Sequence, residues 1–223
     1  STPVAFKVDG SAKRVTVVKS KMPQKGRITV NKNGEVFSSV TETDGIFQPV
    51  YEVKGLQGAV YEIIALEDII TRDGTVRYTK GQVVDTITTD NNGIATSKLL
   101  YLGKYEVREV KAPYGMILNK EPVNVELVYA GELVDVTSIS ASFVNERQKI
   151  VIDLKKTMEQ DGIFNIGSNG EIINVRFGLY AAEDMTAADG KVIPKDALLE
   201  TAYCDKDGNI VFATDLPIGV SVY

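Results

Sequence analysis

One lysine in this sequence occupies a position where a charged side chain is costly. In the stretch GRITVNK, residues 26–32, a β-strand would alternate its side chains between two faces, so Ile28, Val30 and Lys32 would point the same way. An uncompensated ammonium group in an apolar interior is expensive. Lys32 must therefore be neutralised there or must react.

Two later strands end an apolar row in the same manner. The strand expected at residues 105–109 places Glu109 after two apolar side chains on one face, and the strand expected at residues 139–145 places Asn145 after three. A lysine, a glutamate and an asparagine could thus meet inside one sandwich. The same pattern also fits three residues at strand ends near water, forming an ordinary ion pair and a turn amide.

A buried meeting of these three side chains would support autocatalytic cross-linking. Desolvation lowers the pKa of a lysine and raises that of a glutamate, and a neutral amine is a nucleophile. A protonated Glu109 could polarise the Asn145 carbonyl and relay protons. Attack of Lys32 Nζ on Asn145 Cγ would release ammonia and leave an isopeptide bond in one turnover, with no cofactor and no metal.

The amino-acid composition argues against several other classes of function. The 223-residue chain has no histidine, so Ser-His-Asp and Cys-His catalysis are impossible within it, and we expect no enzyme acting on outside substrates. The net charge of −5 argues against a nucleic-acid surface. No apolar run approaches the roughly 18 residues that span a membrane, so we expect no membrane insertion in this fragment. One cysteine, Cys204, excludes an internal disulfide framework.

Turn signals divide the chain into many short strands. The pairs Asn33-Gly34, Asp73-Gly74, Asn92-Gly93 and Asp207-Gly208 separate β-branched and aromatic runs. Short strands at regular spacing predict an all-β fold of immunoglobulin-like sandwiches.

The chain also resembles itself at long range, which predicts tandem domains. The sequence DGIF occurs at 44–47 and at 161–164, and residues 60–69 resemble residues 176–185. The expected parts are closing strands of a preceding repeat or a connector at 1–25, a complete sandwich at 26–147, and a second repeat truncated before its last strands at 148–223.

The second repeat has its own candidate cross-link lysine. The row Ile150, Ile152, Leu154 repeats the apolar row before Lys32, and the period of two then selects Lys156. The matching glutamate would fall beyond Tyr223, so no bond is expected within the strands present.

Four motifs resemble the Cna B-type, or SpaA-type, prealbumin-like domain of Gram-positive surface proteins and pilins. They are GRITVNK (26–32), GAVYEIIA (58–65), YEVREVKAPYGM (105–116) and FVNE (143–146). The resemblance implies that Lys32 is the reactive lysine, Glu109 the catalytic glutamate and Asn145 the acceptor.

The resemblance also implies a role. The chain would be a structural stalk or backbone module of a cell-surface adhesin or pilin-like protein, extracellular and either at the cell surface or anchored to the cell wall. Its partners would be neighbouring repeats of the same protein, and a host surface protein or glycan. The alternative is a ligand-binding sandwich that recognises a host protein or carbohydrate through its loops, which a patch of exposed aromatics on one rim would favour.

Overall fold

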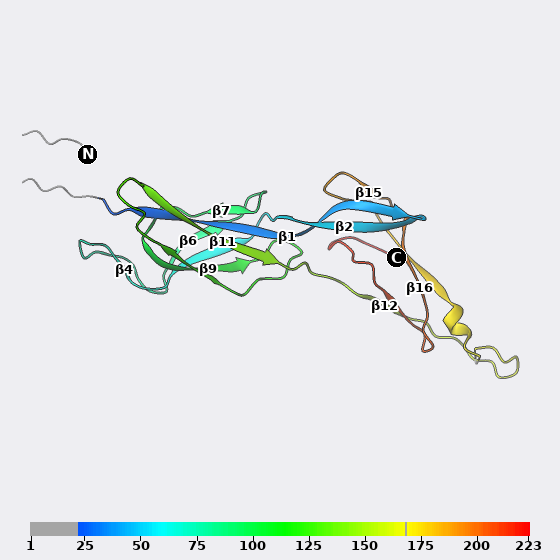
Figure 1. The fold of residues 1–223 in the computed structure, drawn as a ribbon. Coiled ribbons are helices and arrows are strands. Elements are labelled where there is room, and N and C mark those ends of the chain that lie inside the picture. The colour runs from blue at the N-terminus through cyan, green and yellow to red at the C-terminus, as the bar shows by residue number, and fades with distance from the viewer. Residues whose placement is uncertain (1–21, 168) are drawn as a thin grey trace, which may run out of the picture.

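The stretch GRITVNK begins β1 (Lys25–Thr43), a strand of 19 residues that links the two halves of the molecule (Figure 1). The computed structural model describes residues 22–167 and 169–223. These residues form two units lying end to end, each with its own hydrophobic core. The all-β prediction is confirmed. Most of the expected closing strands at 1–25 lie outside the described residues, and Lys25 is the first residue placed in a strand.

The first unit is a sandwich of two sheets. In one sheet, β1 pairs in parallel with β11 (Val136–Asn145) and antiparallel with β2 (Ile46–Gly55). The short strands β7 (Ile94–Thr96) and β8 (Leu100–Tyr101) also pair with β1. The facing sheet has the order β10 (Val123–Leu127), β9 (Gly103–Lys111), β3 (Val60–Ala65), β6 (Val83–Thr88). The apolar faces of the two sheets enclose the first core.

One predicted turn is wrong. Asn33-Gly34 lies inside β1, whereas the other three Asn-Gly and Asp-Gly pairs lie in turns. A side chain at Gly34 would meet Leu56 at 2.5 Å and the backbone of Asn145 at 3.0 Å. This glycine therefore serves close packing beside the site rather than a change of direction.

The second unit repeats the strand spacing of the first. Its strands are β12 (Ile152–Lys155), β13 (Arg176–Tyr180), β14 (Met185–Thr186), β15 (Val192–Ile193), β16 (Leu198–Tyr203) and β17 (Asn209–Phe212), with a 3₁₀ turn η1 (Glu171–Asn174). The β13–β16 pair corresponds to β3–β6, and the β14–β15 hairpin corresponds to β4 (Ile69–Ile70) with β5 (Val76–Tyr78).

The β1–β2 hairpin crosses from the first unit to the second. Its base belongs to the first sheet, while Val40 is part of the second core and Phe37 and Phe47 pack against it. Residues 26–147 therefore contribute side chains to both cores. The proposed domain boundary after residue 147 stays a prediction.

The row that leads to Lys156 is not buried. Ile150 and Leu154 are 46% and 42% exposed, and Lys156 is exposed as well. Within the described ranges β12 pairs with β17 alone, whereas β1 is flanked by strands on both sides. The alternation pattern assigns a side chain to a face, but burial requires strands that cover that face. Lys156 is thus exposed in the described structure, and its role as the cross-link lysine of the second repeat stays a prediction.

Candidate functional site

Lys32 and Asn145 lie on neighbouring strands and face the same core. The parallel register pairs Lys32 with Phe143, which places Asn145 two residues further along β11. Residues two apart on a strand share a face, so the two side chains are diagonal neighbours within reach of a long side chain. Lys32 is 1% exposed and Asn145 is 3% exposed.

Glu109 reaches the same point from the opposite sheet. It follows the buried Tyr105 and Val107 on β9 and is 3% exposed. Asn145 Nδ2 donates hydrogen bonds to both of its carboxylate oxygens, at 3.0 and 2.9 Å. The structure thus brings together the three predicted site residues.

Two further groups hold the Glu109 carboxylate. Tyr61 donates its hydroxyl to Oε1 at 3.2 Å, and the backbone N–H of Asn119 donates to Oε2 at 2.7 Å. The Tyr61 ring is fully buried and packs on Phe143, with ring centroids 4.7 Å apart. Sequence reasoning missed both groups. The sequence could have pointed to Tyr61, because a buried tyrosine hydroxyl usually finds a hydrogen-bond partner. The backbone N–H of Asn119 could not be found in this way, because every non-proline residue has one.

Burial lowers the pKa of the Lys32 amine. Desolvation lowers its pKa from 10.5 to about 8, although the charge of Glu109 acts in the opposite direction. Nζ donates to the backbone carbonyl of Asn33 at 3.2 Å. The backbone N–H of Lys32 donates to the carbonyl of Gly93 at 2.7 Å, and the backbone carbonyl of Lys32 accepts the N–H of Leu56 at 3.0 Å. The lysine is therefore fixed in place, and a substantial fraction of its amine is neutral near pH 8.

The Asn145 amide has one unpaired end. Its Oδ1 is buried and has no hydrogen-bond partner among the described residues. Rotating the amide by 180° exchanges Oδ1 with Nδ2 and turns the carbonyl oxygen toward Glu109. In the rotated orientation the carbonyl oxygen takes the place that Nδ2 holds beside the Glu109 carboxyl group.

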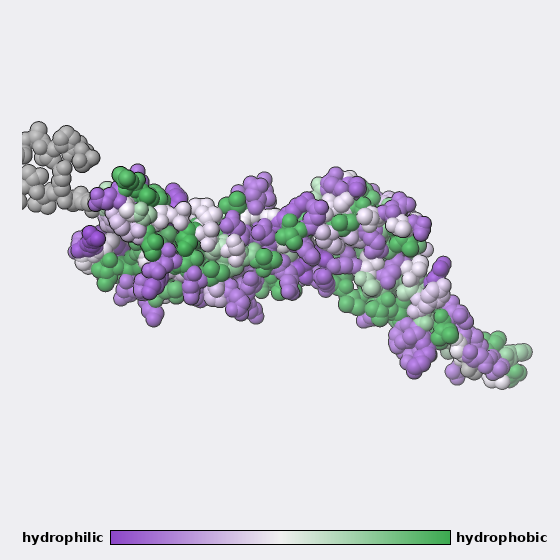
Figure 2. Space-filling model, viewed as in Figure 1, coloured by the Kyte–Doolittle hydropathy of each residue, from purple (hydrophilic) through white to green (hydrophobic). Residues whose placement is uncertain are grey.

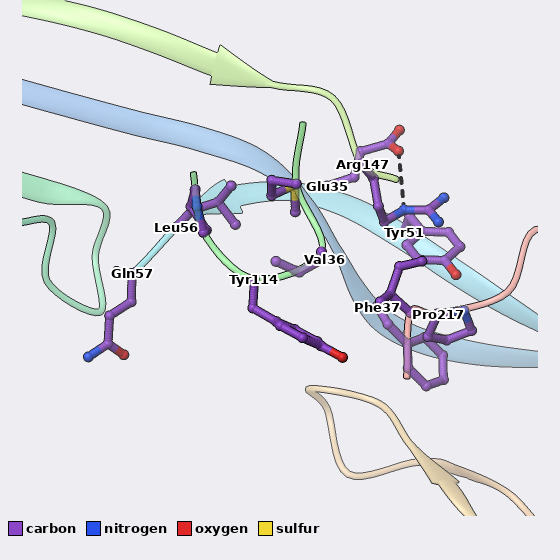
Figure 3. A pocket seen from close by; sticks show the side chains of 13 residues that line it. Glu35, Val36, Phe37, Tyr51, Leu56, Gln57, Tyr114, Arg147 and Pro217 are labelled. Carbon is purple, nitrogen blue, oxygen red and sulfur yellow. Dashed lines mark ion pairs between the residues drawn. The ribbon is translucent and has the colours of Figure 1, made fainter. Parts of the chain in front are cut away.

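A second polar cluster joins the two units two residues after Asn145. The Arg147 side chain is 5% exposed, lies 3.7 Å from the Tyr51 ring centroid and pairs with both oxygens of Asp215. It also forms a 3.7 Å ion pair with Glu35, drawn as a dashed line in Figure 3. The hydrogen bond from Arg147 holds the pKa of Asp215 below its ordinary value. Sequence reasoning did not find this junction.

The pocket in Figure 3 lies beside that cluster. Its lining includes one highly exposed aromatic ring, Tyr114, at 83% exposure.

The described residues hold no group of acidic, histidine or cysteine side chains that could bind a metal ion. The Asp90 carboxylate accepts the N–H groups of Asn92 and Ile94, which is a hairpin turn. In the described part of the chain, no helix has the length and apolar character to cross a membrane.

Comparison with known proteins identifies the sandwich. Residues 47–140 match the model of the SpaA prealbumin-like fold domain, a segment that includes most of β2, all of β3 and β9, and the catalytic candidate Glu109. This part of the chain is a SpaA-type prealbumin-like domain. The match confirms the resemblance seen in the motifs, whereas the roles of individual residues remain proposals.

The matching proteins described below share a quarter or less of their aligned residues with this chain. The Trypsin-resistant surface T6 protein of Streptococcus pyogenes serotype M6 is 25% identical over 142 residues, which are 62% of this chain and 25% of that protein. The chain therefore spans about a quarter of this curated relative. Among solved structures, the Bacillus anthracis TIE protein matches 87% of this chain and 26% of its own, with 20% identity and a TM-score of 0.49. The full-length major pilin SpaD of Corynebacterium diphtheriae matches 58% and 32%, with 21% identity and a TM-score of 0.38.

Proposed function

We propose that this chain is a structural module of a cell-surface adhesin or pilin-like protein, stiffened by an autocatalytic isopeptide bond between Lys32 and Asn145. The observation that carries the proposal is the joint burial of Lys32, Glu109 and Asn145 in one apolar core. Burying three polar side chains at one point is costly unless they are fully paired, and Asn145 Oδ1 is not. A reaction that consumes the amine and the amide accounts for their presence.

The proposed step balances with the residues present. The lone pair of neutral Lys32 Nζ attacks Asn145 Cγ, and a C–N bond forms as the carbonyl electrons move to Oδ1. Protonated Glu109 donates a hydrogen bond to that oxygen, and its carboxyl group transfers a proton from Nζ to Nδ2. The Cγ–Nδ2 bond breaks and ammonia leaves. Glu109 ends in its starting form, so one carboxyl group suffices.

The bond would change how the domain carries force. β1 and β11 are parallel neighbours, so tension between the start of β1 and the end of β11 shears the hydrogen bonds between them. A covalent link from Lys32 to Asn145 carries that tension directly and removes residues 33–144 from its path. This behaviour suits a stalk module and does not depend on disulfides.

The wider setting belongs to the same proposal. The streptococcal relative is a surface protein by name, which supports an extracellular, cell-wall-associated location for this chain. Its proposed partners are neighbouring repeats of the same protein, with a host protein or glycan as a further partner. The module acts once on itself and has no outside substrate.

Intact mass tests the bond. The purified chain should be about 17 Da lighter than its sequence mass, the mass of one ammonia. Glu109→Ala should restore the sequence mass while the circular dichroism spectrum stays that of a β-sandwich. Glu126→Ala, an exposed glutamate on β10, is the matched control and should keep the loss. A wild-type chain with the full sequence mass would refute the Lys32–Asn145 bond.

A further inference from the structure

The two units are joined by a hairpin tip. The DGIF turn at residues 44–47 ends the β1–β2 hairpin, and Ile46 pairs in parallel with Leu198 at the start of β16. Phe47 packs against the second core. The tip of one unit therefore extends the sheet of the next and adds apolar side chains to its core.

The hairpin also contacts the turn between β14 and β15. The N–H groups of Ala188 and Asp189 donate to the carbonyls of Phe37 and Ser38 at 3.0 and 3.1 Å. The surface that receives the hairpin thus consists of the start of β16 and the β14–β15 hairpin.

A second DGIF tip lies on the loop that protrudes from the second unit, between β12 and β13. Residues 161–164 carry Ile163 and Phe164, which are 88% and 73% exposed. The Asp161 carboxylate accepts the N–H groups of both residues, and Asp161 pairs with Ile166 across the turn. The first tip begins a strand, whereas the second is a closed turn that presents two apolar side chains to solvent. Figure 2 shows apolar surface on this protruding lobe.

Among the described residues, a second surface of the same kind is exposed on the first unit. β6 corresponds to β16 and is the edge of its sheet among the described strands. Val83 begins β6 as Leu198 begins β16, and it is 45% exposed. Ile70 and Val76, on the hairpin that corresponds to β14–β15, are 58% and 50% exposed. The free tip and the β4 region lie at opposite ends of the molecule (Figure 1).

We propose that the free tip, residues 161–166, docks on the β4–β6 surface of a further unit of the same kind, as the first tip docks on the second unit. The partner is a second copy of this prealbumin-like unit, arranged head to tail. A contact between two different surfaces at opposite ends of the molecule repeats along an open row when successive rotations do not close a ring, which suits an extended stalk. This inference rests on the proposed stalk role but not on the Lys32–Asn145 bond.

Directed disulfide formation between full-length chains tests the contact. One preparation carries Ile163→Cys and the other Val83→Cys, and the buried native Cys204 is kept in both. The chains are mixed at about 1 mM, the effective concentration that a short tether provides, under mild oxidation. The disulfide-linked heterodimer is then measured by mass spectrometry against a mixture of Ile163→Cys with Val128→Cys, an exposed valine elsewhere on the first unit.

The proposal expects the Val83 pair to exceed the Val128 pair at least about fivefold, the scale of a weak contact made effective by proximity. Adding Phe164→Asp to the Ile163→Cys chain should abolish the excess, because it places a charge in the apolar contact. Equal yields from the two pairs would overturn the docking and leave the tip to some other partner. An excess that survives Phe164→Asp would overturn the apolar contact. The mass test of the isopeptide bond is independent of either result.

Discussion

The buried amine of Lys32 should make the stability of an unlinked chain rise with pH. Asn145→Ala removes the acceptor carbon, so the variant folds with a free Lys32. The pKa of that amine falls from 10.5 to about 8 on folding, mainly through desolvation. Between these two values the unfolded chain binds more protons than the folded chain, so the free energy of unfolding increases as pH rises. Below about pH 8 and above about pH 10.5 the amine contributes no pH dependence.

The size of this effect follows from the separation of the two pKa values. At 1.36 kcal/mol per unit, a fall from 10.5 to about 8 corresponds to about 3 kcal/mol, most of it gained by pH 10. Urea unfolding of Asn145→Ala at pH 7 and pH 10 measures the gain. The double variant Lys32→Met/Asn145→Ala is the control, because it keeps every other titrating group. If the two variants change in parallel between these pH values, the buried-amine argument is wrong.

Three further predictions concern the bond and the junction. Glu109→Ala should lower the free energy of unfolding by about 4–5 kcal/mol, the chain-entropy value for the loop of about 113 residues that the bond closes; equal guanidinium midpoints for variant and wild type would contradict this. Tyr61→Phe should slow the mass loss of newly synthesised chain about tenfold or more, since a hydrogen bond to the Glu109 carboxyl disappears; an unchanged rate would show that Tyr61 serves packing alone. Arg147→Met should cost about 1–3 kcal/mol, because Asp215 loses its buried partner at a partly exposed junction, and calorimetry should show the two units unfolding in separate steps; a single unshifted transition would refute that role.

Local pattern explains why the site residues could be found from the sequence. Alternation along a strand depends on backbone geometry alone, so it assigned Lys32, Glu109 and Asn145 to inward faces without knowledge of the partner strands. Two of these rows belong to β1 and β11, which lie side by side, and the third belongs to β9 in the facing sheet. The inward orientation of all three is what the structure shows.

Local patterns do not decide burial or strand length, which depend on long-range packing. Lys156 has an apolar row like that of Lys32, but it lies exposed because β12 has one neighbouring strand among the described residues. Asn33-Gly34 has the residues of a turn, yet β1 continues through it because Gly34 lets Leu56 and Asn145 approach closely.

The sequence by itself determined the all-β class, three of the turns and the three inward polar side chains, because strand period and turn chemistry are local properties. Only the tertiary structure decided what surrounds them. It brought Tyr61 to the Glu109 carboxylate, placed Arg147 against Asp215, and carried the β1–β2 hairpin into the second core. These contacts join residues far apart in the chain, and their geometry depends on sheet order and register, which no local pattern specifies.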